Sequence, residues 1–445
     1  MRELFLVAVV LAGLVATLRY PFAGVLLWTW FTCMQPHQAA YGFVQSAPIN
    51  FIIAVVTLLS WLISRERKMP PADVTLFLLL AFLVWITFNG FYAVEPSWSW
   101  PLWNRTWKTI ALGLVVSAMA TSRIRVHALV WAAVVSVLYY GIKGGVFTIL
   151  TGGHSHVLGP SGSYLGDNNQ LAAVTLMVLP LANYLRLQSA NRWVSHGFYA
   201  AIALSMVSVL GSYSRGAFIA LGGLGVVAWF RSRNWFVYPI AVAIVAIPAF
   251  LFMPQAYFDR LNTIGSSDPD GSFHGRIVAW QVAWRYATDH FPLGNGFSGS
   301  ERPAIFNHYF PLEPTHAAHN IFFEVLGDNG FIGLALYVAI LVYAFLNCAK
   351  IRRLTRGNPE FSWAFDLASM IQLSLFAFCM AGSALSLAYY DVLFICVGLL
   401  SAMRVVLKKV LIEGRFRAQK PVVPQPAIAH ALFDSTQSDG VSRST

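Results

Sequence analysis

Residues 331–349 read FIGLALYVAILVYAFLNCA and include no charged side chain. Wound as an α-helix, this stretch would extend about 28 Å at 1.5 Å per residue, close to the thickness of the hydrocarbon core of a bilayer. Comparable apolar runs recur along most of the chain, and the pattern predicts an all-α polytopic membrane protein. We expect membrane segments near residues 4–18, 22–34, 48–64, 73–92, 102–120, 126–150, 170–187, 196–213, 215–230, 235–253, 320–349, 362–387 and 389–408.

The composition of the chain leads to the same class. Of the 445 residues, 57% are hydrophobic and 11% are charged, whereas soluble domains carry about 25% charged residues. So few charges cannot cover a water-exposed surface, which excludes a soluble enzyme, a β-barrel and a disordered scaffold. The net charge of +11 resides mainly in short loops. Long basic stretches with interleaved aromatic residues are absent, so nucleic acid is not an expected partner.

The start of the chain leaves the number of spans open. Arg19-Tyr20-Pro21 divides the first two apolar segments, which form either two crossings or one broken helix. The count is therefore about twelve or thirteen, and the side of the amino terminus stays undecided. Met1-Arg2-Glu3 before an apolar run is typical of a signal peptide. Further segments follow at once without an A-x-A site, so we expect an uncleaved first segment.

Basic residues between the apolar segments predict the orientation of the chain. They gather in alternate loops, which are cytoplasmic by the positive-inside rule. The other loops are then external, near residues 89–101, 151–169, 211–216, 254–319 and 387–391. Four regions follow: N-terminal transmembrane helices in 1–253, a large periplasmic loop in 254–319, C-terminal transmembrane helices in 320–410, and a disordered cytoplasmic tail in 411–445. Within the large loop, residues 276–289 are predicted to form an amphipathic helix.

Several cations lie on the predicted external side, where Lys and Arg are normally scarce. They are Arg105 and Lys108 at the start of one span, Lys143 near the end of another, Arg215 after a tight turn, and Arg276 in the large loop. A charge within the bilayer costs about 2.5–3.5 kcal/mol even on the lenient insertion scale. One interpretation is that these side chains reach toward lipid headgroups. The other is an outward-facing site for a diphosphate, since Arg offers phosphate a planar fork of donors and Lys a point charge.

A histidine and two acids follow the large loop. His319 lies at the outer mouth of the span that begins at residue 320, and its ordinary pKa of about 6.5 suits a general base. Glu324 and Asp328 lie farther along the same helix at a spacing of four residues. The alternative interpretation of His319 is a capping or hydrogen-bonded histidine at the interface.

No metal or cofactor motif appears. His154-Ser155-His156 and His316-x-x-His319 lack a matching set of carboxylate ligands, and HExxH is absent. We therefore expect neither a catalytic metal nor a cofactor. The cysteines lie in or beside apolar runs without CxxC spacing, and we interpret them as small buried apolar residues; they are Cys33, Cys348, Cys379 and Cys396.

Three motifs flank the large loop in a fixed order. Ser214-Arg215-Gly216-Ala217 opens a span. Gly275-Arg276 with Trp280 precedes 289–296, which read DHFPLGNG, and residues 319–333 read HNIFFEVLGDNGFIG. Together they resemble the O-antigen ligase and Wzy-polymerase superfamily of lipid-linked glycan transferases over about residues 205–345. The stretches 140–145 (YGIKGG) and 165–169 (LGDNN) resemble the subgroup of exosortase-associated O-glycosylation ligases.

The resemblance implies a glycosyltransferase of the GT-C type in the bacterial inner membrane, with its active site facing the periplasm. The donor would be a glycan on undecaprenyl diphosphate, and the acceptor a sugar hydroxyl of lipid A–core, in lipopolysaccharide biosynthesis. The reaction would be inverting and would need no metal. The family's arginines correspond to Arg215 and Arg276, and its histidine to His319.

The chemistry assigns roles to these residues. Fixed cations must stabilise the leaving diphosphate, a role we give to Arg215, with Arg276, Lys143, Arg105 and Lys108 helping to bind it. His319 is the expected general base, and Glu324 could orient it. The sequence does not separate a ligase from a polymerase or a protein O-oligosaccharyltransferase. A transporter or flippase of an anionic lipid is the alternative from another class, although the chain lacks the internal repeat usual for one.

Overall fold

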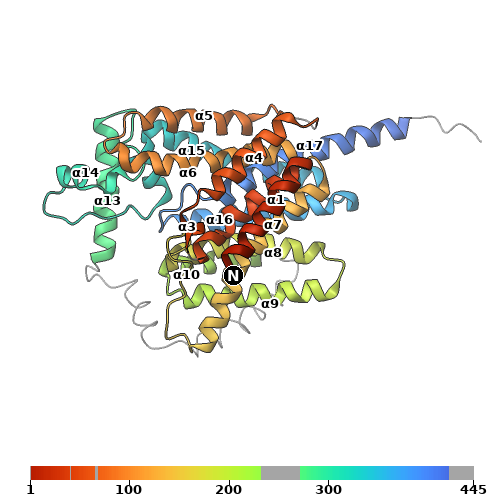
Figure 1. Cartoon of the computed structure of the whole chain (residues 1–445), viewed down its shortest axis with the longest axis horizontal. Helices are drawn as coiled ribbons and strands as arrows, with labels where there is room; N and C mark the ends of the chain where they lie inside the picture. The colour runs from red at the N-terminus through yellow and green to blue at the C-terminus, as the bar shows by residue number, and fades with distance from the viewer. Residues whose placement is uncertain (1, 41, 66–68, 232–270, 420–445) are drawn as a thin grey trace, which may run out of the picture. The chain divides into compact units, whose positions relative to one another are not determined.

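The computed structural model describes residues 2–40, 42–65, 69–231 and 271–419. Within them the chain is helical, without a β-strand. Met1–Val405 forms one compact unit and Val406–Thr445 another. The helices are α1 (Arg2–Arg19), α2 (Pro21–Met34), η1 (Pro36–Ala39), α3 (Phe43–Ser46), α4 (Ile49–Ile63), α5 (Val74–Gly90), α6 (Pro96–Met119), α7 (Arg123–Leu150), α8 (Asn168–Gln188), α9 (Arg192–Gly211), α10 (Arg215–Arg231), α13 (Gly271–Asp289), η2 (Gly299–Glu301), α14 (Pro303–Tyr309), α15 (Ile321–Thr355), η3 (Pro359–Phe361), α16 (Ser362–Gly382) and α17 (Asp391–Gln419) (Figure 1).

Every apolar segment predicted within the described residues is a helix. Among these residues, five helices are long and apolar enough to cross a membrane: α7, α8, α9, α15 and the segment Pro359–Gly382 that contains α16. Helices α2, α4 and α5 are apolar but shorter. The chain is thus a multi-pass α-helical membrane protein. The count of about twelve spans stays a prediction, and the predicted segment 235–253 lies outside the described residues.

The first two predicted segments are separate helices that pack against each other. Tyr20 between them has extended backbone, and Pro21 begins α2, since proline cannot continue a preceding helix but fits a first helical turn. Gly24 lies where α2 meets α1 and α4, and a Cβ there would collide with Thr17 and Thr57. The alternative of one long broken helix is therefore excluded.

Helices α7 and α9 pack closely through glycine. A Cβ at Gly145 would collide with the Leu204 carbonyl, and one at Gly144 would collide with the Ser208 hydroxyl. Small residues let membrane helices approach until their backbones touch. Gly141, the third glycine of the 140–145 motif, packs in the same way against the Ser205 hydroxyl, so all three glycines serve helix packing.

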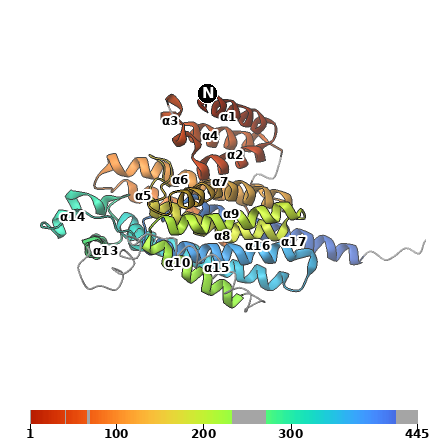
Figure 2. The same ribbon diagram turned by 90° about the horizontal axis from the view of Figure 1, so that it is seen from below.

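Helix α8 packs against both α9 and α16 (Figure 2). Its residues from Leu171 to Ala182 are buried. The Ser374 hydroxyl of α16 donates to the Met177 carbonyl of α8 at 2.6 Å. The amino-terminal end of α8 is therefore held in place by its neighbours, which matters because that end borders the candidate site.

Helix α15 is broken near its start, where a continuous helix over 320–349 was predicted. Gly330 has φ 66 and ψ −171, outside the helical region. The carbonyl groups just before it accept hydrogen bonds from other segments: Gly327 from the Asn295 N–H at 2.9 Å, Asp328 from the Gly296 N–H at 3.0 Å, and Asn329 from the Trp85 indole at 2.7 Å. The break is thus satisfied by outside donors, as a broken membrane helix requires.

Two glycine-rich motifs meet at this break. A Cβ at Gly294 would collide with the backbone nitrogen of Asn329, and a Cβ at Gly330 would collide with the Pro292 carbonyl. The Asn89 side chain joins them, since it accepts from the Gly294 N–H at 2.9 Å and donates to the Asp328 carbonyl at 2.7 Å. Residues 292–296 therefore lie directly against α15.

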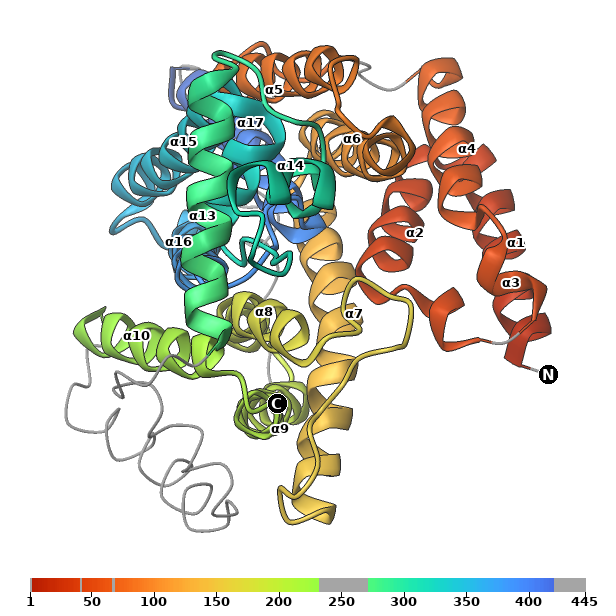
Figure 3. The ribbon, with the colours of Figure 1, turned by 90° about the vertical axis from the view of Figure 1, so that its left-hand side faces the viewer.

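The predicted amphipathic helix of the large loop is α13, which begins earlier than expected. It packs against α14, η2 and α15 (Figure 3). Trp284 lies on its outer face and is 53% exposed. The buried cluster between α13 and α14 consists of Val278, Ala279, Val282, Tyr286, Ile305 and Phe306.

The C-terminal helices differ from the prediction at their ends. Helix α16 stops at Gly382, so residues 383–390 connect it to α17 instead of extending it to 387. Helix α17 continues to Gln419, so 411–419 is helical where a disordered tail was predicted, and 420–445 lies outside the described residues. All four cysteines are free, and Cys33, Cys348 and Cys396 are buried, as predicted for small apolar residues.

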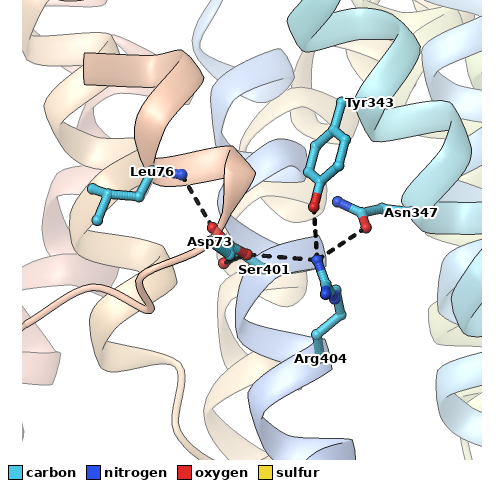
Figure 4. A network of polar contacts seen from close by, with 6 residues as sticks. All are labelled: Asp73, Leu76, Tyr343, Asn347, Ser401 and Arg404. Carbon is cyan, nitrogen blue, oxygen red and sulfur yellow. Dashed lines mark hydrogen bonds and ion pairs between the residues drawn. The ribbon is translucent and has the colours of Figure 1, made fainter. Parts of the chain in front are cut away.

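A polar network joins α5, α15 and α17 far from the start of α15 (Figure 4). Asp73 caps α5 by accepting from the Leu76 N–H at 3.1 Å. Its other oxygen accepts from the Ser401 hydroxyl at 2.9 Å and lies 3.8 Å from the Arg404 guanidinium. Arg404 also donates to the Tyr343 hydroxyl at 2.8 Å and to the Asn347 amide oxygen at 3.3 Å.

Candidate functional site

Arg215 is the first residue of α10 and follows a tight turn from α9. The Ser214 hydroxyl caps α10 by accepting from the Ala217 N–H at 3.2 Å. The Ser212 hydroxyl in turn accepts from the Ser214 N–H at 3.2 Å. Tyr213 between them has a positive φ of 58, a conformation uncommon outside glycine. The Ser-Tyr-Ser sequence thus fixes where α10 begins and where Arg215 lies.

The segment that precedes α8 holds this turn from the other side. The Val157 N–H donates to the Gly211 carbonyl at 3.0 Å. Asn168, the first residue of α8, donates its side-chain amide to the Ser212 carbonyl at 2.6 Å. Two loops predicted to be external, 151–169 and 211–216, are therefore joined.

Helix α13 carries Arg276 and contacts the segment before α15. The Trp280 indole donates to the Ala318 carbonyl at 2.6 Å, and its ring stacks on Phe323 with centroids 5.1 Å apart. A Cβ on Gly275 would collide with the His316 ring. Gly275 and Trp280 of α13 thus both pack against the histidine-containing segment and the start of α15.

His319 is half-buried immediately before α15. Its φ of 43 lies in the left-handed region, which costs about 1–3 kcal/mol for a residue other than glycine. Asn320 caps α15 by accepting from the Phe322 N–H at 2.9 Å. The Asn320 amide also donates to the Ser383 carbonyl at 3.0 Å. The cap belongs to Asn320, so the capping role considered for His319 is not the one observed.

Electrostatics connect the three predicted residues. Burial lowers the pKa of Arg276 below its usual range, and the charge of Arg215 lowers it further. Burial also lowers the pKa of His319 from its usual 6.5; Arg276 and His316 act in the same direction, and Asp167 opposes them. Arg276 therefore lies near both Arg215 and His319, and the lowered pKa of His319 leaves a neutral imidazole that can accept a proton. The Nε of Arg276 is buried without a hydrogen-bond partner among the described residues.

Arg105 makes a separate contact, with Tyr164. Its guanidinium stacks on the Tyr164 ring at 3.6 Å, and its Nη2 is buried without a hydrogen-bond partner in the described chain. The Tyr164 hydroxyl donates to the Ser386 carbonyl at 3.4 Å. Arg105 thus reaches the same connecting segment, 383–390, that Asn320 binds.

Lys108 and Lys143, the two lysines of the predicted site, lie on α6 and α7. The Lys108 ammonium lies 5.3 Å from the centre of the Phe51 ring, which faces it toward α4. Lys143 is exposed on α7, between helix-packing glycines. The binding roles expected for both lysines stay predictions.

Glu324 makes a contact that the sequence did not suggest. Its carboxylate accepts from the Ala388 N–H at 3.0 Å, which holds the 383–390 segment against α15. The acid whose charge reaches His319 is Asp167. The orienting role expected of Glu324 stays a prediction, and Asp167 is the residue that sequence reasoning missed. The 165–169 motif was the available signal, because its acid directly precedes α8.

No group of three or more His, Cys, Asp or Glu that could hold a metal ion occurs among the residues described. Near Arg215 and His319, what the chain offers a ligand is two guanidinium groups and one imidazole. Such a set is suited to binding a phosphate group and accepting a proton.

These features define a multi-pass membrane protein with a cationic site at the start of α15. Residues 200–338 match the family model described as O-antigen ligase. Residues 1–190 match a family of unknown function, DUF5935. No curated protein matches the chain.

The matched segment contains Arg215, Arg276 and His319, and the match supports membership of the chain in the O-antigen ligase-like superfamily. That family is glycosyltransferase-like, comprising ligases and polymerases, and its substrates are in general lipid-linked glycans.

Proposed function

We propose that the protein is an O-antigen ligase that transfers a glycan from undecaprenyl diphosphate to a sugar hydroxyl of lipid A–core. The site would face the periplasm from the bacterial inner membrane, within a GT-C-type arrangement of about twelve spans. The observation that carries the proposal is the convergence of Arg215, Arg276 and His319 within the segment that matches O-antigen ligase.

In the proposed reaction, the acceptor hydroxyl oxygen attacks the anomeric carbon from the face opposite the diphosphate. The carbon–oxygen bond to the diphosphate breaks, and the diphosphate leaves with the electron pair, so the configuration inverts. His319 accepts the hydroxyl proton. Arg215 and Arg276 stabilise the charge that develops on the diphosphate, because their guanidinium groups are in place before the reaction.

Arg105 extends the proposed site. Its unsatisfied Nη2 is a donor available to a second phosphate oxygen, and the Tyr164 ring holds the guanidinium in one plane. Stacking of this kind contributes about 0.5–2 kcal/mol depending on solvent exposure. Lys108 and Lys143 are assigned the weaker role of attracting the anionic donor, since Lys108 lies over the Phe51 ring and Lys143 is exposed on α7.

Deleting the gene and examining lipopolysaccharide by gel electrophoresis tests the proposal. A ligase predicts loss of the ladder with bare core left behind. A core that carries one repeat unit would instead indicate a polymerase, and an unchanged ladder would contradict both.

Transfer by the purified protein, with lipid-linked donor and core acceptor, tests the metal-free chemistry. We expect full activity in EDTA. Loss of activity that a divalent cation restores would contradict stabilisation by arginine alone.

A further inference from the structure

The amino-terminal end of α8 has no part in the proposed function so far, yet it contacts both halves of the site. Asn168 donates to the Ser212 carbonyl at 2.6 Å, in the turn that begins α10 with Arg215. Gln170 donates to the Ser386 carbonyl at 3.4 Å. The first turn of α8 therefore touches the Arg215 turn on one side and the 383–390 segment on the other.

The 383–390 segment leads to His319. Asn320, the residue after His319, donates to the Ser383 carbonyl at 3.0 Å. Glu324, one turn farther along α15, accepts from the Ala388 N–H at 3.0 Å. A continuous set of hydrogen bonds thus runs from the Arg215 turn through α8 and 383–390 to the start of α15.

Asp167 is the charged residue of this first turn. One oxygen of its carboxylate caps α8, accepting from the N–H groups of Asn169 at 2.9 Å and Gln170 at 3.3 Å. Both bonds use the same oxygen, so the cap leaves the second carboxylate oxygen available. These two hydrogen bonds fix the direction of the Asp167 side chain relative to α8. Helix α8 is itself held in place, because it is buried along most of its length.

The charges around His319 come from several elements. Arg276 lies on α13, and His316 precedes His319 in its own segment; both disfavour a protonated imidazole. On α15, Glu324 is held by the Ala388 N–H. The 383–390 segment contains no charged residue, and Asp391 after it accepts from Thr32 and Thr109 at 2.9 and 2.8 Å. Asp167 is the group whose charge favours the protonated form most.

We propose that Asp167 is a positioning residue for His319: from the first turn of α8, its carboxylate stabilises the imidazolium that forms when His319 accepts the acceptor's proton. The proton stays on His319. Without Asp167, the new positive charge would arise beside Arg276 with nothing described nearby to offset it. This inference rests on the proposed function, and it adds a third element, α8, to the site.

The substitution Asp167→Asn removes the charge of this side chain and keeps its ability to cap α8. Asparagine is as good a helix N-cap as aspartate, so the start of α8 should remain. We expect maximal transfer to fall about tenfold, since proton transfer follows the basicity of the base. The acidic limb of the pH–rate profile should also shift to lower pH, because removing the carboxylate lowers the pKa of His319.

The matched control is Asp73→Asn, which removes the charge from another capping aspartate, on α5. Its pH–rate profile should stay that of the unsubstituted protein. A slower Asp167→Asn enzyme with an unchanged acidic limb would show that Asp167 acts only on the structure. An unchanged rate and profile would show that it has no role.

A second measurement does not depend on transfer. Diethyl pyrocarbonate acylates the neutral imidazole, and mass spectrometry of the peptide can locate the label on His319. We expect the pH midpoint of labelling to move lower in Asp167→Asn and to stay in place in Asp73→Asn. An unmoved midpoint would overturn the inference. Absence of transfer by the unsubstituted protein would overturn the proposed function, whatever the labelling result.

Discussion

Two arginines near the two ends of α15 have contrasting surroundings. Arg404 has a carboxylate, a phenol and an amide oxygen around its guanidinium (Figure 4). Arg276, beside the start of the same helix, lies near the positive charge of Arg215 and has a buried Nε without a partner among the described residues. The first arginine has its partners within the protein, whereas the second is the one that we propose binds an anion from outside.

An unpartnered nitrogen alone does not mark such a site. Arg352 and Arg302 also have a buried Nε without a partner in the described chain. Arg352 donates to Gln372 at 2.9 Å, and Arg302 stacks on Trp98 at 3.8 Å. What distinguishes Arg276 is the nearby histidine, since Arg352 also lies near a second arginine, Arg231, which donates to the same Gln372 oxygen. The contrast with Arg404 therefore rests on the grouping of Arg276 with Arg215 and His319, and the unpartnered nitrogen is only part of it.

The largest effect is expected from His319→Ala. Loss of a general base typically costs about 10²- to 10⁴-fold in rate, while the arginines should still bind the donor. Single-turnover transfer and donor binding, measured on the same preparation, check this. His319→Gln keeps a hydrogen bond without basicity, so unchanged turnover with the same pH profile would mean that His319 orients the substrate.

Arg215→Ala should lose about 10²- to 10³-fold in transfer, the usual cost of removing one preorganised donor. Arg215→Lys should recover only part of it, because a point charge replaces a fork. Arg231→Ala, at the other end of α10, is the matched control and should transfer normally. Normal transfer by purified Arg215→Ala would make Arg215 structural and remove the contrast with Arg404.

Arg404→Gln should lower the stability of the protein and leave transfer intact, which is the reverse of the effect expected for Arg215→Ala. It leaves Asp73, whose side chain is 15% exposed, without its cation, and an unsatisfied buried group costs about 1–3 kcal/mol or more if charged. We expect a lower unfolding temperature in detergent with transfer per folded molecule retained. A large loss of transfer at unchanged stability would contradict the structural role of Arg404.

The smallest effect is expected from mild acidification. Because burial and Arg276 hold the pKa of His319 below its usual 6.5, His319 is neutral at pH 7 and becomes protonated as the pH falls through that lowered pKa. Transfer should therefore change little between pH 8 and pH 7 and decline on the acidic side. A decline that begins well above pH 6.5 would contradict the lowered pKa.

The sequence predicted the helices better than their interruptions. Hydropathy located each apolar segment within the described residues, because a membrane helix must satisfy its own backbone. It did not predict the break at Gly330, since the donors that satisfy it come from Trp85 and Asn295, which are distant in the chain. Periodicity alone also extended α16 to 387, whereas the helix stops at Gly382.

For the candidate site, too, the sequence predicted some residues and missed one. Misplaced charges and a histidine at a helix mouth indicated Arg215 and His319, and the resemblance connected them with Arg276. Asp167 was overlooked because an aspartate before a helix is ordinarily a cap, which it also is. Its effect on His319 depends on how α8 packs against its neighbours, and local sequence carries no information about that.

The break in α15 has a mechanical consequence. The segment 292–296 is joined to 327–330 through backbone groups packed without side chains between them. Separating the two would leave several backbone groups unsatisfied, each at about 1–3 kcal/mol. Residues 292–296 directly follow α13, so this end of α13 and the start of α15 are expected to move as one rigid body. A bulky lipid-linked substrate would then have to enter where the site is bounded by side chains and loops, beside α8 and α10.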